Sequence, residues 1–242
     1  MRFLLGIWTW LSFALVSTVG FVICLVLFLL TLPLDPTRRW TGRGIRITGR
    51  AMMSAVPAWR FSIHGPLPDR LPERCVCVCN HRSNIDPFVL TRLPWEMKFL
   101  AKSKLFQIPI VCWGIFLAGD IPLVRGSAKS IKRAMVRAAW YVERGMPVLI
   151  FPEGTRSLDG HLLPFKDGAF RLAIETGADL LPLALAGTEH ALRKGDWRPS
   201  PARGRMTVGT PISTAGLTVA DVPALKQRVA AAISELVASI EK

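Results

Sequence analysis

A histidine and an aspartate lie five residues apart in a polar stretch, Asn80 to Pro87, and are His81 and Asp86. The run Cys75 to Cys79 before them is typical of a strand, while Pro87 fits the first position of a helix and makes Asp86 its expected N-cap. A tight loop can turn the carboxylate back onto the imidazole, which fixes the tautomer and leaves the other ring nitrogen free to accept a proton. The pair predicts a general base, although a loop histidine beside a capping aspartate fits these residues equally well.

A second polar block, Glu153-Gly154-Thr155-Arg156, follows an apolar run from Pro147 to Ile150 that is typical of a buried strand. A glycine flanked by these residue types lets backbone amides and a guanidinium converge on an anion. α/β folds place ligands at the carboxyl ends of their strands. The block therefore predicts an anion-binding loop at that edge of a sheet.

Together the two motifs resemble the glycerolipid acyltransferase family, most closely its 1-acylglycerol-3-phosphate acyltransferases. The likeness rests on the order and spacing of four blocks in about half of the chain. They are His-x4-Asp, an arginine motif, Glu-Gly-Thr-Arg and a weaker Leu-Pro-Leu, at Asn80 to Asp86, Gly119 to Arg125, Glu153 to Arg156 and Leu181 to Leu183. Pro122 occupies a place where the family often has Phe or an aliphatic residue, which leaves the shape of the acceptor pocket open.

The resemblance implies an enzyme that transfers a fatty acyl group from an acyl thioester to the sn-2 hydroxyl of 1-acylglycerol-3-phosphate, making phosphatidic acid. The co-substrate would be acyl-coenzyme A or acyl carrier protein, with no cofactor and no metal. His81, held by Asp86, would remove the hydroxyl proton as that oxygen attacks the thioester carbonyl. The chain has no Gly-x-Ser-x-Gly block, the commonest serine-hydrolase signature, and offers no obvious covalent nucleophile.

The resemblance also implies which residues hold the acceptor. Arg156 and Arg125 would bind its phosphate, with Lys102 as a further candidate. Three residues of the same block would supply backbone donors and orient the loop: Gly154, Thr155 and Glu153. Taken alone, Arg125 also fits an exposed residue at a strand end, and Lys102 also fits a solvated lysine.

Other functions fit parts of the sequence. The acceptor could be another lysolipid, such as a lyso-ornithine lipid or lysophosphatidylcholine. The chain could also be a non-catalytic binder of anionic lipid, or a metal hydrolase with His81 and Asp86 as ligands. The presence of both residues beside Arg156 argues against an inactive binder, and no further His or carboxylate follows at a usual ligand spacing.

The segment from Phe3 to Leu34 carries no charge and is long enough to cross the roughly 30 Å hydrocarbon core at about 1.5 Å per residue. It exceeds the apolar region of a signal peptide and ends without a small-residue cleavage site. The arginines that flank it are Arg2 on one side and Arg38, Arg39, Arg43, Arg46 and Arg50 on the other. By the positive-inside rule, the bulk of the protein is expected at the cytoplasmic face of the cell membrane.

Two arrangements of this segment are compatible with the sequence. Trp8, Trp10 and Trp40 fit interfacial anchors on either side of a single membrane span. Gly20 in the middle of the segment, and the basic stretch after Pro36, instead fit a helical pair that lies on the lipid surface.

The chain is strongly basic, with 31 Lys and Arg against 17 Asp and Glu and a formal net charge of +14. Such a charge suits nucleic acid, anionic lipid or an acidic acyl carrier. The membrane segment and the lack of a nucleic-acid-reading motif argue against nucleic acid. The five cysteines do not indicate disulfides in a chain that faces the cytoplasm, and Cys75, Cys77 and Cys79 alternate as small residues on one buried strand face do.

Strand-like and helix-like stretches alternate after the apolar segment. Strands are expected at Ala58 to His64, Arg74 to Cys79, Met97 to Ala101, Asp120 to Arg125, Pro147 to Phe151, Asp179 to Ala186 and Arg205 to Gly209. Helices are expected after Asp86 and at Ile108 to Leu117, Ser127 to Arg144, Phe170 to Thr176 and Val222 to Ile240. This order predicts an α/β catalytic domain over residues 58–242, with a mainly parallel mixed sheet flanked by helices, behind a membrane-anchoring segment over residues 1–57.

Overall fold

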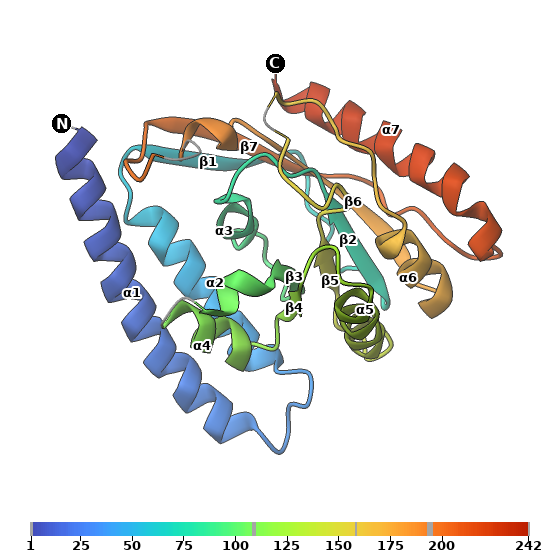
Figure 1. The fold of residues 1–242 in the computed structure, drawn as a ribbon, viewed down its shortest axis with the longest axis horizontal. Coiled ribbons are helices and arrows are strands. Elements are labelled where there is room, and N and C mark those ends of the chain that lie inside the picture. The colour runs from blue at the N-terminus through green and yellow to red at the C-terminus, as the bar shows by residue number, and fades with distance from the viewer. Residues whose placement is uncertain (1, 108–109, 158, 193–195, 242) are drawn as a thin grey trace.

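The computed structural model describes residues 2–107, 110–157, 159–192 and 196–241, whose strands form one seven-stranded sheet. The strands are β1 Trp59–His64, β2 Cys75–Cys79, β3 Lys98–Lys102, β4 Ile121–Leu123, β5 Val148–Ile150, β6 Asp179–Ala186 and β7 Ala202–Val208. Their order across the sheet is β1-β7-β6-β2-β5-β3-β4 (Figure 1). All neighbouring strands are parallel except β6 and β7. The expected α/β fold with a mainly parallel mixed sheet is confirmed.

Helices cover both faces of this sheet (Figure 1). They are α1 Arg2–Thr31, α2 Arg39–Ser54, α3 Asp86–Leu90, α4 Val111–Leu117, α5 Ala128–Val142, α6 Gly168–Thr176 and α7 Val222–Glu241. α5, α6 and α7 pack on one face, while α2 and α3 pack on the other. α4 lies within the helix expected from Ile108, whose residues 108–109 are outside the described part of the chain.

The central strand β2 contributes to both cores because its side chains alternate. Val76 and Val78 pack with α5, α6 and α7, whereas Cys75, Cys77 and Cys79 pack on the α2 and α3 side. The three cysteines are buried on one face, as expected. The hydrogen-bonded Cys75 thiol and burial raise the pKa of Cys77, and burial raises the pKa of Cys79, so both thiols stay neutral.

Two strand boundaries differ by more than one residue from those expected, and most of the others differ by one. β7 begins at Ala202 rather than Arg205, because the edge strand β1 pairs with it from its first residue. β4 ends at Leu123, two residues before Arg125. Arg125 therefore lies in the turn between β4 and α5, where its side chain is free of the sheet.

The apolar segment forms one helix, α1, that is long and apolar enough to cross a membrane and packs along α2. At its beginning, Arg2 donates hydrogen bonds to Asp196 and Ser200 at 3.3 and 2.9 Å. In its middle, Gly20 meets Thr48 of α2 so closely that an added Cβ would lie 2.3 Å from the Thr48 hydroxyl oxygen. α1 therefore contacts the rest of the protein at its beginning and in its middle.

α2 contributes an arginine to a buried charge cluster formed by Arg46, Glu96, Lys98 and Asp120. Arg46 bonds to Asp120 and lies 3.6 Å from Glu96, and Lys98 donates to Glu96 at 2.9 Å. All four residues are buried. Arg46 was expected only as one of the arginines that flank the apolar segment. In the structure its side chain is buried between α2 and the sheet. The division into residues 1–57 and 58–242 stays a prediction, and the Arg46–Asp120 ion pair crosses it.

Candidate active site

The loop after β2 brings His81 and Asp86 together. His81 Nδ1 and Asp86 Oδ2 are 2.8 Å apart. The same carboxylate oxygen accepts hydrogen bonds from the backbone N–H groups of Arg82 and Ser83, each at 2.7 Å. Asp86 is fully buried and His81 is 8% exposed. Three donors from one short loop therefore hold the carboxylate against the imidazole.

The expectation that Asp86 is the N-cap of the following helix is wrong. Ile85 occupies the cap position and Asp86 is the first residue of α3. Its side chain makes no bond to the amides of its own helix, because Oδ2 is turned back to the preceding loop. The structure thus decides between the two sequence interpretations in favour of a histidine–aspartate pair.

The orientation of the imidazole suits a general base. With Nδ1 donating to Asp86, Nε2 carries the free lone pair. Nε2 makes no hydrogen bond to any residue in the described ranges. The ring stacks on Phe151, with centroids 4.2 Å apart and planes at 24°, which restricts its rotation. A hydroxyl that approached Nε2 could therefore transfer its proton to a nitrogen already fixed in position.

Glu153 ties the two predicted loops together. Its Oε1 accepts from the His81 backbone N–H at 2.8 Å, and its Oε2 accepts from the Leu163 N–H at 3.0 Å. The Ser157 N–H in turn donates to the His81 carbonyl at 2.8 Å. Burial raises the pKa of Glu153, while the bonds from His81 and Leu163 oppose that rise. Its contacts make it a support for the catalytic loop, and they leave it no atom directed at a substrate phosphate.

Two arginines lie near one another beside these loops. Arg125 is exposed and Arg156 is half-buried. Partial burial and the positive charge of Arg156 lower the pKa of Arg125. Neither guanidinium forms an ion pair with an acid in the described ranges, so the two cations can share an added anion. Lys102 is exposed at the end of β3, the carboxyl edge shared by the parallel strands, and among the described residues no hydrogen bond or ion pair joins it to the loops that carry the two arginines.

The backbone at Gly154 requires glycine. Its φ is +69°, a left-handed conformation that side chains with a Cβ rarely adopt. A Cβ there would also lie 2.8 Å from Cε and Nζ of Lys166. Lys166 thus crosses the loop close to Gly154, beside the exposed Thr155, and adds a cation that sequence analysis missed.

Asn80 also escaped the sequence analysis as a supporting residue. Its side-chain amide donates to the Leu185 carbonyl at 2.9 Å and accepts from the Leu185 N–H at 2.8 Å. This pair of bonds fixes the end of β2 to β6 one residue before His81. The sequence feature that could have indicated this role is a side-chain amide directly after a buried strand.

Arg82, next to His81, is buried and contacts distant parts of the chain. Its guanidinium donates to Glu241 at 2.7 Å and to the Gly160 carbonyl at 2.9 Å, and it lies 3.6 Å from Glu189. Glu241 is 159 residues away in the sequence. No local pattern signals contacts of such length.

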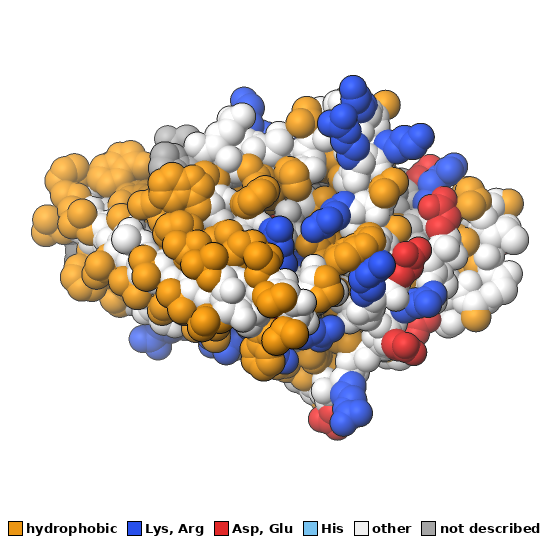
Figure 2. All heavy atoms as spheres, turned by 90° about the horizontal axis from the view of Figure 1, so that it is seen from below, with side chains coloured by type: hydrophobic (Ala, Val, Ile, Leu, Met, Phe, Trp, Pro, Cys, Tyr) orange, Lys and Arg blue, Asp and Glu red, His pale blue; other side chains and the backbone are white. Residues whose placement is uncertain are grey.

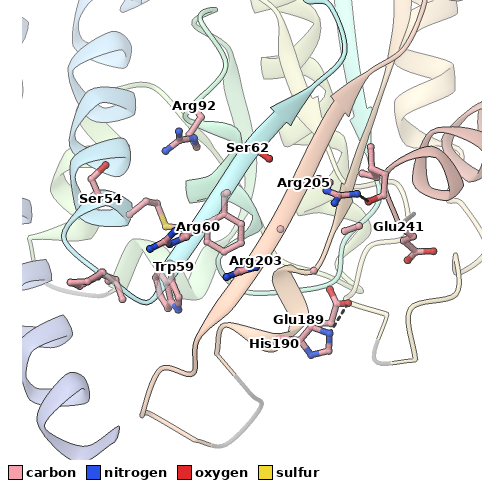
Figure 3. Close-up of a pocket in the computed structure, with 18 residues that line it drawn as sticks. Ser54, Trp59, Arg60, Ser62, Arg92, Glu189, His190, Arg203, Arg205 and Glu241 are labelled. Atoms are coloured by element: carbon pink, nitrogen blue, oxygen red, sulfur yellow. Dashed lines mark hydrogen bonds and ion pairs between the residues drawn. The ribbon is translucent and has the colours of Figure 1, made fainter. Parts of the chain in front are cut away.

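A pocket of about 820 Å³ lies over β1 and β7 next to these loops (Figure 3). The four arginines in its lining are Arg60, Arg92, Arg203 and Arg205. Glu189 and Glu241 at its border are the carboxylates that contact Arg82. None of the residues proposed for catalysis or acceptor binding lines it, so it is separate from the His81 site.

Comparisons with known proteins agree with this geometry. The acyltransferase family model matches residues 60–186. A chloroplastic 1-acyl-sn-glycerol-3-phosphate acyltransferase of Brassica napus is 38% identical over 148 residues, 60% of this chain and 42% of that protein. A 1-acyl-sn-glycerol-3-phosphate acyltransferase of Chlamydomonas reinhardtii is 35% identical over 185 residues, 75% of this chain and 54% of that protein. The chain spans about half the length of the curated relatives it matches.

A solved structure extends the likeness beyond these ranges. The crystal structure of the 1-acyl-sn-glycerophosphate acyltransferase PlsC from Thermotoga maritima is similar with a TM-score of 0.76 and 26% identity. The alignment covers 97% of this chain and 95% of that one. Because the family model spans more than half of the 242 residues and includes both polar loops, the chain belongs to the acyltransferase family.

Proposed function

We propose that the protein transfers a fatty acyl group from an acyl thioester to the sn-2 hydroxyl of 1-acylglycerol-3-phosphate and so makes phosphatidic acid for phospholipid synthesis. The observation that carries this proposal is the His81 imidazole, whose Nδ1 lies 2.8 Å from Asp86 and whose Nε2 makes no hydrogen bond to the described residues. The names of the Brassica and Chlamydomonas relatives support the choice of acceptor.

The proposed reaction is a direct transfer. His81 Nε2 takes the proton of the acceptor hydroxyl as its oxygen bonds to the thioester carbonyl carbon. The buried Asp86 carboxylate stabilises the imidazolium that forms. The carbon–sulfur bond then breaks, and the thiolate leaves with the proton from the imidazolium. The ester and the free thiol are the products, and His81 returns to its neutral form.

The acceptor phosphate is assigned to the cations beside the Glu153 loop. Arg156 and Arg125 can grip it through charge-assisted hydrogen bonds, and Lys102 stays a further candidate. The Thr155 backbone can add an N–H donor, whereas the Gly154 N–H already donates to the Phe151 carbonyl at 3.1 Å and Gly154 instead permits the left-handed turn of the loop. Glu153 acts on the acceptor only indirectly, because its two carboxylate oxygens accept hydrogen bonds from the backbone N–H groups of His81 and Leu163.

The donor is proposed to be acyl-coenzyme A or acyl carrier protein, with no cofactor. A thioester is already activated toward attack by a hydroxyl, and a positioned base supplies the remaining proton transfer. The reaction as proposed therefore asks for no metal or redox group.

The membrane is proposed as the source of the acceptor. Figure 2 shows a broad hydrophobic area with Lys and Arg side chains beside it. Large exposed apolar residues of α1 include Leu11, Leu15, Val19, Val22 and Leu30. Because α1 also contacts the protein at its beginning and middle, we propose that α1 and α2 lie on the cytoplasmic face of the cell membrane as a helical pair. The proposal includes no nucleic-acid partner.

Acyl transfer by the purified full-length chain tests the function. The assay offers one labelled acyl-coenzyme A with lysophosphatidate, lysophosphatidylcholine or a lyso-ornithine lipid, with and without a chelator. We expect phosphatidic acid from lysophosphatidate, loss of product in His81→Ala, and no effect of the chelator.

Each other result changes a stated part of the proposal. A preference for another lysolipid would replace the acceptor and keep the mechanism. Sensitivity to the chelator would overturn the metal-free reaction. No transfer to any of the three acceptors would remove the proposed activity.

A further inference from the structure

Helix α5 presents one outward face that is rich in cations. The helix contains four Lys and Arg residues and no Asp or Glu. Its outward face, called here the α5 face, comprises Lys129, Lys132, Arg133, Val136, Arg137 and Trp140. Spacings of three and four residues place these side chains together on the helix surface. A hollow of about 500 Å³ lies against them.

The charges of the α5 face are not neutralised within the described ranges. Lys129, Lys132 and Arg133 are exposed and form no hydrogen bond or ion pair there. Arg137 lies over the Trp140 ring at 4.9 Å and forms no ion pair with a described acid. Val136, in the middle of the face, is 63% exposed. The result is a cationic surface with an apolar centre, the pattern expected where an oppositely charged protein binds.

One exposed acidic residue follows the α5 face directly in the chain. Glu143 follows the last turn of α5 and is exposed. It is followed by Arg144, which stacks on Trp140 at 4.2 Å. Glu143 therefore reduces the positive charge only at the end of the helix, beyond the residues of the α5 face.

The position of α5 relates it to both the active site and the membrane-facing helices. α5 packs on the opposite face of the sheet from α2 and α3, so its outer side points away from the layer that α1 covers (Figure 1). Its first residue, Ala128, follows Arg125 by three positions. A partner on the α5 face would thus sit close to Arg125 without competing with the proposed lipid surface.

We propose that the α5 face docks an acidic acyl carrier protein, which delivers the acyl group as a thioester on its flexible arm. This inference rests on the proposed acyl transfer and specifies its donor. Negative side chains on a carrier helix would meet Lys129, Lys132 and Arg133, and an apolar side chain would cover Val136. Attraction between the two surfaces would raise the rate of encounter and make it sensitive to salt.

A charge-reversal variant of the full-length protein tests this docking. The variant is Lys129→Glu, Lys132→Glu and Arg133→Glu, assayed with acyl carrier protein and coenzyme A thioesters of the same fatty acid. We expect kcat/KM for the carrier donor to fall about tenfold or more at low salt. For the coenzyme A donor, kcat/KM should change less than about twofold, because these side chains lie outside the proposed phosphate and base sites.

The matched control reverses three other exposed arginines, Arg60→Glu, Arg203→Glu and Arg228→Glu. These also form no hydrogen bond or ion pair within the described ranges, and the change in net charge is the same. We expect this control to retain most activity with the carrier. Circular dichroism and thermal unfolding show whether both variants are folded, and the salt dependence of wild-type kcat/KM gives a measure that needs no variant.

The outcomes separate this inference from the proposed function. A wild-type protein that uses coenzyme A but not the carrier, or a carrier reaction without salt dependence, would overturn the docking and leave acyl transfer intact. Equal losses with both donors, or a selective loss in the control variant, would also overturn it. If the α5 variant keeps carrier activity but loses binding to anionic vesicles, the face binds lipid instead. Absence of transfer from both donors would reject the proposed function itself.

Discussion

The loops that carry His81 and Glu153 and the buried charge cluster both remove charged side chains from water, but they differ in which polar atoms stay unpaired. In the loops, Asp86 and Glu153 are buried, while His81 Nε2 has no hydrogen-bond partner in the described part of the chain. In the cluster, Arg46 and Lys98 face the carboxylates of Glu96 and Asp120. The first arrangement leaves one ring nitrogen unpaired among the described residues, and the second pairs cations with carboxylates inside the core.

The cluster shows how buried charges balance one another. Burial opposes the charged form of Arg46, but Asp120 and Glu96 outweigh it and raise the Arg46 pKa. Burial lowers the pKa of Lys98 and raises that of Glu96, and the attraction between these two opposes both changes. These ion pairs join α2 to the sheet, although burying the four charged groups costs desolvation energy. Removing one member leaves a buried charge unpaired and destabilises the folded protein.

The contrast gives a rule for this fold. Burial of charge alone does not mark a catalytic site, because the cluster holds as many charged groups as the loops and offers none of them to a ligand. The open nitrogen of His81, oriented by a buried partner, is the distinguishing feature. Variants of the two regions should therefore fail in different assays.

The largest expected effect is on catalysis. His81→Ala should lower kcat by about 10²–10⁴, the usual contribution of a positioned base. The thermal midpoint should stay close to wild type, since the imidazole makes one side-chain hydrogen bond in the described ranges. Steady-state kinetics with lysophosphatidate and a thermal melt measure the two quantities. Wild-type turnover in this variant would place the base at another residue.

Asp86→Asn should also act on turnover, by about 10² or more. Asparagine can still accept from Arg82 and Ser83, but it lacks the charge that stabilises an imidazolium and can present an N–H to the ring instead. Kinetics over a range of pH would reveal the change in the base. An unchanged kcat would mean that Asp86 only shapes the loop.

In the buried charge cluster, Asp120→Asn should reduce the free energy of unfolding by about 3–5 kcal/mol, because it leaves Arg46 without its bonded carboxylate. Denaturant unfolding measures the loss, and kcat of the remaining folded protein should be near wild type. The exposed Asp69→Asn serves as a control that removes the same charge. If Asp120→Asn lowers kcat and leaves stability intact, the cluster is coupled to the active site.

The smallest expected effect separates substrate binding from chemistry. Arg156→Ala should raise the KM for lysophosphatidate by about 10–100-fold, the equivalent of one or two charge-assisted hydrogen bonds. The KM for the acyl donor should change much less. Arg156→Lys should recover part of the loss, because it restores the charge but not the planar fork. A selective rise in the donor KM would assign this loop to the thioester carrier.

Much of the fold follows from patterns that are local in the sequence. Alternation along β2, the apolar run before Glu153 and the helical periodicity of α5 each depend on neighbours within a few residues. The His81–Asp86 pair was predictable for the same reason, since five positions suffice for a loop that closes on itself. An aspartate that only caps the following helix fits the same residues. Only the tertiary structure distinguishes these two interpretations.

The remaining features depend on contacts between distant residues. Arg46 meets Asp120 across 74 positions, and Arg82 meets Glu241 across 159. A charged residue in a sequence carries no mark of its partner, because an ion pair is specified by packing and not by spacing. The sequence by itself determined the order of the strands, the apolar helix and the family resemblance. Only the tertiary structure decided which cations are buried, which face outward from α5, and which nitrogen is left open to a substrate.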